Sequence, residues 1–187
     1  RVMSDIAIFK QMIKSTATVS LEGYESKKKV ILTEPPPANY CVTIYGMPEE
    51  DQVIVIKTDC FTAPKAIFAD SKCECKRADF VIFAETDAVK VIIYIEMKAG
   101  KGGSEGEIIQ QLKGAQCFIG YCREIGQAFW DHQTFLKDYE YRFVSIREIS
   151  ISKRRTRPLK STDLHDRPDK MLKITSSKGL QFRHLIG

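Results

Sequence analysis

The sequence predicts a mixed α/β fold in which a mixed central sheet is flanked by helices. Residues 77–84 and 89–98 are rich in β-branched and aromatic side chains and predict two neighbouring strands. Residues 104–129 carry apolar side chains at helical spacing, and residues 140–151 form a further strand-like segment. Strands grouped around one long helix in this order indicate a mixed α/β domain.

The other predicted elements are one helix and several short strands. Residues 4–14 predict a helix because Ile6, Phe9 and Ile13 recur at helical spacing behind an N-capping serine. Three consecutive prolines at 35–37 interrupt the structure, since proline continues neither a helix nor a central strand. The remaining predicted strands are residues 30–32, 40–45, 53–57, 171–175 and 180–185.

The segments 77–84 and 89–98 predict a β-hairpin, because residues 85–88 between them are typical of a turn. If the hairpin closes symmetrically about that turn, Ala84 pairs with Val91. The same register then extends to both outer ends of the hairpin.

Three polar residues lie at those outer ends. The symmetric register places Asp79 opposite Glu96, whereas a slip of two residues would place Asp79 opposite Lys98. Because side chains alternate along a strand, Glu96 and Lys98 share one face and Met97 points to the other. Both registers therefore bring Asp79, Glu96 and Lys98 together.

This convergence favours a metal site. Opposed residues of an antiparallel pair have Cβ atoms about 4.5–5.5 Å apart, so Asp79 and Glu96 could reach one cation. Two such carboxylates repel each other unless a positive charge intervenes, and Lys98 or a divalent ion would supply it. For Glu-X-Lys alone, the competing interpretation is a solvated surface ion pair of little energetic value. The apolar run 91–95 argues against that, because it indicates an interior strand covered on both faces.

Asp79, Glu96 and Lys98 resemble the signature of the PD-(D/E)XK nuclease superfamily, and the resemblance covers roughly residues 40–150. In that superfamily an Asp begins the second core strand, a Glu/Asp-X-Lys ends the third, and a helix follows. The resemblance implies a restriction-endonuclease-like core. Ala78 stands where the name-giving proline would be.

The resemblance also implies supporting residues. A glutamine on the following helix is frequent in several branches, and Gln111 fits this position, with Gln110 nearly as suitable. Many members add a glutamate from an amino-terminal helix as a metal ligand, for which Glu22 is the candidate, with Glu25 as second choice. The Gln-X-X-X-Tyr pattern of the exonuclease branch is absent, which disfavours that assignment.

Length and composition indicate the domain organisation and the cellular location that we expect. The chain has 187 residues, of which 43% are hydrophobic and 28% charged, and this predicts one globular domain over 1–187. Its apolar runs fall short of the roughly 20 residues that span a bilayer, and no signal sequence is visible. We therefore expect a cytoplasmic protein that does not bind membranes.

Basic residues favour a nucleic-acid partner. The net charge is +5, and the carboxy-terminal extension 152–187 begins with a basic cluster that contains no acidic residue. Such a cluster suits contacts with phosphates, although a solvated loop enriched in arginine is the alternative. The residues predicted to bind nucleic acid are Lys153, Arg154, Arg155 and Arg157.

The cysteines do not form a recognisable zinc motif. Cys73 and Cys75 are separated by one residue rather than two to four, and no second pair completes a site with Cys60. Isolated histidines likewise disfavour a histidine-metal nuclease.

The sequence thus predicts a hydrolase, namely a Mg²⁺- or Mn²⁺-dependent nuclease. The favoured kind is a DNA endonuclease of bacterial defence or DNA repair. Asp79 and Glu96 would bind the metal with help from the Met97 carbonyl, while Lys98 would orient or deprotonate the attacking water, or stabilise charge. Gln111 would be a supporting contact. Double-strand cleavage would suit a homodimer or a partner chain. The alternative is an inert nuclease-fold module that binds nucleic acid or a protein.

Overall fold

The computed structural model describes residues 3–24, 27–100, 102–148 and 164–187. Its helices are α1 (Asp5–Met12), α2 (Glu105–Phe129) and α3 (Phe182–Ile186). Its strands are β1 (Lys29–Glu34), β2 (Tyr40–Tyr45), β3 (Val53–Lys57), β4 (Phe80–Glu85), β5 (Lys90–Ala99), β6 (Glu140–Glu148) and β7 (Leu172–Ile174). Short 3-10 segments occur at Ser15–Ala17, Thr58–Cys60 and Pro168–Lys170.

Two sheets form the framework. The main sheet has five strands in the order β3-β4-β5-β6-β7, and a separate hairpin pairs β1 with β2. Strands β3, β4 and β5 are antiparallel, whereas β6 runs parallel to β5 and to β7. Helix α2 makes the connection between the parallel strands β5 and β6, which must cross from one end of the sheet to the other.

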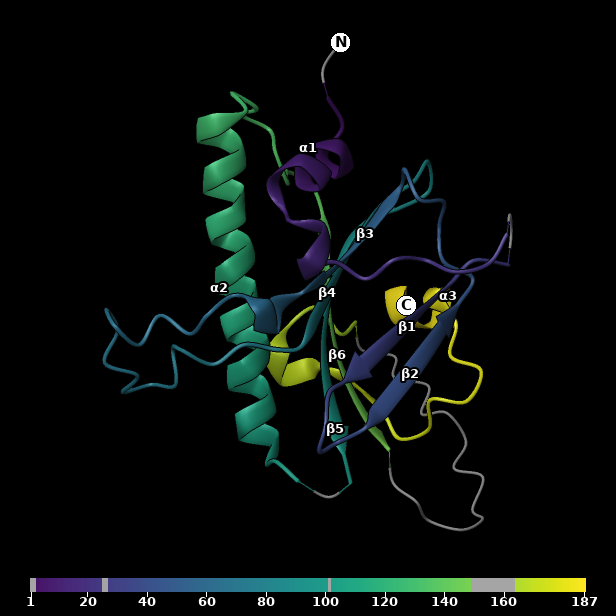
Figure 1. Cartoon of the computed structure of the whole chain (residues 1–187), viewed down its shortest axis with the longest axis vertical. Helices are drawn as coiled ribbons and strands as arrows, with labels where there is room; N and C mark the ends of the chain where they lie inside the picture. Colours follow the sequence, from purple (N-terminus) through teal and green to yellow (C-terminus); the bar gives the residue numbers. More distant parts are fainter. Residues whose placement is uncertain (1–2, 25–26, 101, 149–163) are drawn as a thin grey trace.

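Both faces of the main sheet are covered (Figure 1). Helices α1 and α2 pack on one face, where Phe9, Phe83 and Leu112 are fully buried. The β1–β2 hairpin and α3 pack on the other face, around Leu32 and Ile93. Strands β4 and β5 are therefore apolar on both sides, as expected for interior strands. None of the helices in the described ranges is both long and apolar enough to cross a membrane.

Most predicted elements are present. The helix predicted over 4–14 is α1, and Ser4 accepts a hydrogen bond from Ala7 N as its N-cap. The strand predicted over 171–175 is β7. The strand predicted over 180–185 is wrong, because this segment forms α3 after one isolated bridge at Gln181.

The symmetric register of the central hairpin is confirmed. Ala84 pairs with Val91, and the ladder continues to Phe80 opposite Ile95. One further step places Asp79 opposite Glu96, so the alternative register that opposes Asp79 to Lys98 is wrong. Met97 packs in the core on the hairpin side of the sheet, as strand alternation predicts.

Candidate functional site

The site lies at the end of the sheet where β4 begins and β5 ends. The Asp79 N–H donates to Ile95 O at 3.2 Å, and the Asp79 carboxylate Oδ2 accepts a hydrogen bond from Met97 N at 2.7 Å. The Asp79 carbonyl accepts from Thr58 N at 2.9 Å, which ties it to the end of β3. The backbone of three strands therefore fixes this carboxylate.

Glu96 is a fully buried carboxylate at the end of β5, with 0% of its surface exposed. Lys98 Nζ lies 2.5 Å from its Oε1. Within the described residues, neither Glu96 oxygen accepts a hydrogen bond of regular geometry. The ion pair with Lys98 is therefore what offsets the negative charge of Glu96. A buried carboxylate of this kind is costly unless it is paired or binds a cation.

A third carboxylate, Glu34, reaches this site from the β1–β2 hairpin. Glu34 follows Val30 and Leu32 on the inward face of β1, and both of those residues are fully buried. Glu34 is close enough for its charge to act on Asp79, and the charge of Lys98 acts on Glu34 in turn. The sequence analysis did not select Glu34.

Burial raises the pKa of all three carboxyl groups, and the charges of Glu96 and Glu34 add to this at Asp79. Burial, followed by the charge of Glu96, raises the pKa of Asp79 to about 9, against the opposing hydrogen bond from Met97 N. Burial raises the pKa of Glu96 to about 7, although Lys98 opposes this. Burial also raises the pKa of Glu34. Burial and the charge of Glu96 therefore keep a proton on Asp79 at neutral pH.

Lys98 remains charged in this setting. Burial alone would lower its pKa, but the ion pair with Glu96 and the charges of Asp79 and Glu34 outweigh burial and raise it. The glycine loop after β5 passes close to the Lys98 side chain, since a Cβ at Gly103 would lie 3.3 Å from Lys98 Cε. Gly103 also has a φ of +78°. The loop is in turn held by Arg147, whose Nη2 donates to Gly103 O at 3.0 Å.

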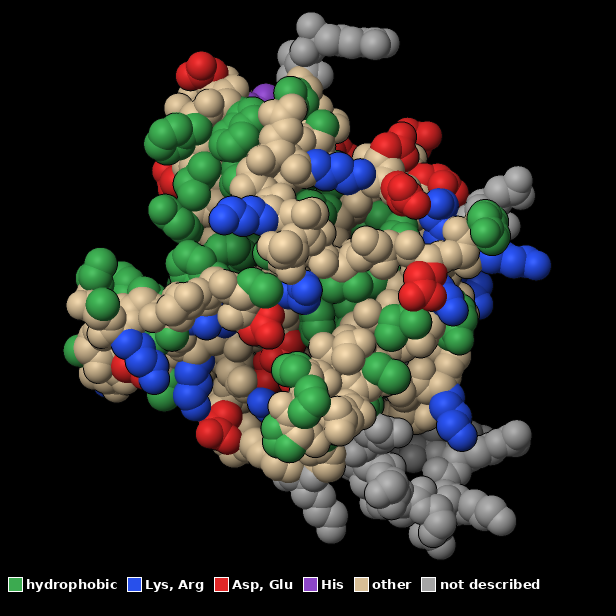
Figure 2. All heavy atoms as spheres, viewed as in Figure 1, with side chains coloured by type: hydrophobic (Ala, Val, Ile, Leu, Met, Phe, Trp, Pro, Cys, Tyr) green, Lys and Arg blue, Asp and Glu red, His purple; other side chains and the backbone are tan. Residues whose placement is uncertain are grey.

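The amino terminus of α2 stands beside the same end of the sheet. Ser104 and Glu107 form a reciprocal capping box, which fixes where the helix begins. Glu107 also pairs with Lys76 at 3.5 Å and adds to the electrostatic surroundings of Lys98. Figure 2 shows acidic side chains in a hollow between α2 and the β1–β2 hairpin, with basic side chains around them.

The other predicted residues are distributed differently. The backbone of Met97 belongs to the site through its N–H, while its side chain lies on the opposite face of the sheet. Gln111 is half-buried on α2, and its Oε1 has no hydrogen-bond partner among the described residues. Glu22 is not in the site, because it pairs with Lys29 at 3.4 Å at the opposite end of β1 from Glu34. Glu25 and the basic residues Lys153, Arg154, Arg155 and Arg157 lie outside the described residues.

The donor chemistry suits a hard divalent cation. Carboxylate oxygens are the protein ligands that Mg²⁺ and Mn²⁺ prefer, and neither oxygen of the buried Glu96 has a hydrogen-bond partner among the described residues. In the described parts of the chain, however, no three acidic, His or Cys side chains are spaced to hold a metal as they stand. Lys98 lies against Glu96, so metal binding would require small movements of these side chains and the loss of protons.

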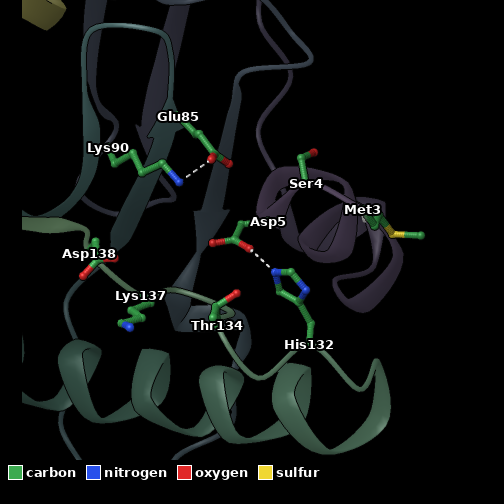
Figure 3. A pocket seen from close by; sticks show the side chains of 9 residues that line it. All are labelled: Met3, Ser4, Asp5, Glu85, Lys90, His132, Thr134, Lys137 and Asp138. Carbon is green, nitrogen blue, oxygen red and sulfur yellow. Dashed lines mark ion pairs between the residues drawn. The ribbon is translucent and has the colours of Figure 1, made fainter. Parts of the chain in front are cut away.

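A separate cavity of about 480 Å³ lies at the other end of the β4–β5 hairpin (Figure 3). Four of its charged side chains form two pairs: His132 Nε2 lies 3.1 Å from Asp5 Oδ1, and Lys90 Nζ lies 2.7 Å from Glu85 Oε1. Asp5 also accepts a hydrogen bond from Leu136 N at 3.0 Å. The contacts of Asp5 join α1 to the segment after α2, so we assign this cavity a structural role.

Comparison with models of known protein families, with curated proteins and with solved structures gave no match. The functional argument therefore depends on the geometry and chemistry of the acidic site.

Proposed function

We propose that the chain is a metal-dependent nuclease that hydrolyses phosphodiester bonds, with DNA as its substrate. The observation that carries the proposal is the meeting of Glu34, Asp79, Glu96 and Lys98 at one end of the sheet. Carboxyl groups gathered around one lysine form an arrangement that a divalent cation would stabilise.

The order of elements supports this proposal. In the antiparallel series β3-β4-β5, Asp79 directly precedes the second strand, Glu96 and Lys98 end the third, and α2 follows. These are the positions that the PD-(D/E)XK resemblance assigns to the same residue types. A restriction-endonuclease-like core is accordingly the fold that we propose for this sheet and its helices.

Each residue then has a role. Glu34, Asp79 and Glu96 would hold one or two Mg²⁺ or Mn²⁺ ions, with the Met97 carbonyl as a further donor. A metal bound there supplies Lewis-acid polarisation of the scissile phosphate and a lower pKa for bound water. Because its surroundings raise the pKa of Lys98, that residue acts as a cation that orients water and stabilises developing negative charge.

The test is cleavage of supercoiled plasmid DNA with Mg²⁺ or Mn²⁺ by wild type and two variants, Lys98→Ala and Glu96→Gln. We expect each variant to lose about 100-fold or more of the cleavage rate. The matched control is Lys90→Ala, which removes the other ion pair of the same hairpin, at its opposite end. Equal rates in wild type and Lys98→Ala would overturn the nuclease assignment.

One observation favours a second function, an inert nuclease-fold module that binds nucleic acid or a protein. Lys98 lies on Glu96 at 2.5 Å, which already supplies the positive charge that this carboxylate requires. Calorimetric titration with Mn²⁺ separates the two functions. Binding that disappears in Asp79→Asn supports the nuclease, whereas DNA binding without any metal binding supports the inert module.

A further inference from the structure

The loop between β3 and β4 presents two apolar side chains to solvent. Residues 61–76 extend past α2 and form a separate lobe of the molecule (Figures 1 and 2). Near its tip, Ile67 is 83% exposed and Phe68 is 53% exposed. Adjacent exposed residues of this size, on a projecting loop, mark an interaction site more often than a single exposed residue does.

The tip of this loop is an ordered turn with internal hydrogen bonds. Ile67 N and Phe68 N both donate to Pro64 O, at 3.1 Å and 3.0 Å. Farther along, Asp70 Oδ1 accepts from Cys75 N, and the Glu74 carboxylate accepts from Ser71 N and Lys72 N. These hydrogen bonds fix the shape of the loop and also engage both of its acidic side chains.

The base of the loop is anchored to α2. A Cβ at Gly114 would lie 1.6 Å from Lys76 O, so backbone meets backbone there. Phe61 packs against Phe118 and Tyr121 with ring centroids 4.8 Å and 6.3 Å apart. A rigid base and an exposed tip are what a loop needs if it is to insert into a partner.

The charge of the lobe is suited to an anionic partner. Lys65 and Lys72 are exposed on either side of the apolar tip, and Lys65 makes only a loose 4.0 Å contact with Asp70. Lys76 and Arg77 add positive charge toward the base. The carboxylates of Asp70 and Glu74 accept hydrogen bonds from backbone N–H groups, Glu74 is itself exposed, and the three lysines of the loop outnumber these two acidic residues.

The loop also leads directly into the acidic site. Arg77 donates from Nε to Thr58 O, and two residues later the chain reaches Asp79. Lys76 pairs with Glu107, which contributes to the surroundings of Lys98. The base of the loop therefore adjoins the proposed catalytic residues.

We infer that the tip of the 61–76 loop is a wedge that inserts Ile67 and Phe68 between nucleic-acid bases, while Lys65 and Lys72 contact the flanking phosphates. This inference rests on the proposed nuclease function and specifies its substrate class as nucleic acid whose bases are unstacked or easily unstacked. Insertion of apolar side chains between base steps is an established means of holding deformed nucleic acid, and a base stacked on an aromatic side chain contributes substantially to affinity.

Binding is measured by fluorescence anisotropy in EDTA, so that cleavage does not intervene. The probe is a fluorescein-labelled DNA duplex with a central stretch of unpaired thymines, compared with the fully paired duplex. We expect Ile67→Ser/Phe68→Ser to bind the unpaired probe about tenfold or more weakly, with a smaller loss on the paired duplex. The matched control is Phe129→Ser, an exposed aromatic residue near the end of α2, which should bind as wild type.

Two further readouts report the mechanism. A 2-aminopurine base at the unpaired stretch should change its fluorescence with wild type and not with Ile67→Ser/Phe68→Ser. Lys65→Ser/Lys72→Ser should reduce the slope of log affinity against log salt by about 2, while the 2-aminopurine response at saturation persists. Thermal melts verify that each variant is folded.

Several results would overturn the wedge. It fails if Ile67→Ser/Phe68→Ser binds both probes as wild type does, or if wild type binds neither probe. It also fails if the tip variants lose only self-association or binding to phosphatidylserine vesicles. Tip-dependent DNA binding without Mn²⁺-dependent cleavage would support the wedge and remove the nuclease proposal, so the two failures are distinguishable.

Discussion

Asp79 is a largely buried carboxyl group whose pKa is strongly raised by its surroundings. Its carboxyl group is hydrogen-bonded by Met97 N, which favours the charged form, yet burial and the charges of Glu96 and Glu34 favour the protonated form more strongly. The balance raises the pKa of Asp79 to about 9, compared with about 3.9 for an exposed Asp. The folded protein therefore binds a proton that the unfolded chain releases at neutral pH.

This difference in proton binding predicts how stability depends on pH. An acid whose pKa is raised on folding stabilises the folded state below its unfolded pKa, and that contribution is lost as pH rises through the folded pKa. In the absence of metal, we expect wild type to lose stability between about pH 4 and pH 9 relative to Asp79→Asn. The asparagine can still accept the hydrogen bond from Met97 N. The measurement is the melting temperature of both proteins across this pH range.

The control for this prediction is Asp87→Asn, which removes an exposed carboxylate in the turn of the same hairpin. Its melting temperature should follow that of wild type at every pH. A constant difference between wild type and Asp79→Asn from pH 5 to pH 9 would show that Asp79 is not protonated in the folded protein.

At the residue scale, local features made half of the site predictable. The turn at 85–88 is short and its flanking strands are apolar, so the pairing of Ala84 with Val91, and with it that of Asp79 and Glu96, follows from the sequence. Glu34 belongs to another sheet, and no local sequence pattern predicts which carboxylate of a distant hairpin will lie beside Asp79. The choice of Glu22 failed because an antiparallel bridge and an ion pair with Lys29 hold it at the far end of β1.

Among the elements, α2 is the one that links the site to the projecting loop. Two of its glycines have different surroundings: Gly114 touches the backbone of Lys76, whereas nothing lies within 4 Å of a Cβ at Gly120. The loop approaches α2 closely at Gly114 because that residue has no side chain. Gly120 has no such contact.

Alanine substitutions at these glycines should therefore have opposite effects. Gly120→Ala should stabilise the protein by up to about 1 kcal/mol, because alanine has the higher helix propensity. Gly114→Ala gains the same propensity but forces backbone atoms apart, and we expect a net loss of about 1–3 kcal/mol. Urea denaturation followed by circular dichroism measures both. A stabilised Gly114→Ala would mean that the loop does not pack on α2 as described.

Element type was harder to predict at the carboxy terminus. Leu180 and Phe182 are two residues apart, as on one face of a strand, whereas Phe182 and Leu185 are three apart, and all three are buried together on one side of the main sheet. The segment becomes helical because side chains distant in sequence contact the carbonyl groups at its carboxy-terminal end. Arg142 Nε donates to Ile186 O at 2.7 Å, and His165 Nε2 lies 2.8 Å from Leu185 O. Both partners are distant in sequence, which is why local periodicity gave the wrong element.

At the scale of the whole molecule, the acidic site is where two separate sheets meet. Asp79, Glu96 and Lys98 come from the main sheet, and Glu34 comes from the β1–β2 hairpin that covers one of its faces. The apolar inward face of β1, ending in Leu32, packs on the main sheet and so carries Glu34 to the end where β4 begins. Packing of the two sheets therefore completes the cluster of carboxylates.

This assembly gives a prediction that separates Glu34 from the glutamate that sequence reasoning selected. Glu34→Gln should reduce metal-dependent cleavage at least about tenfold, because it removes a carboxylate beside Asp79 and Glu96. Glu22→Gln should leave cleavage unchanged, since among the described residues the Glu22 side chain forms an ion pair with Lys29 away from the site. Both variants are measured on the same plasmid substrate over a range of Mn²⁺ concentrations.

The dependence on Mn²⁺ concentration tests whether Glu34→Gln has lost a metal ligand. If Glu34 holds the cation, the variant should need more Mn²⁺ for half-maximal cleavage, and its melting temperature should rise less when Mn²⁺ is added, because binding to the folded state alone stabilises it. Without metal, Glu34→Gln should melt no lower than wild type, since the substitution removes the cost of burying the Glu34 carboxylate. If Glu34→Gln cleaves as wild type while Glu22→Gln does not, the hairpin brings its carboxylate to the sheet for packing alone.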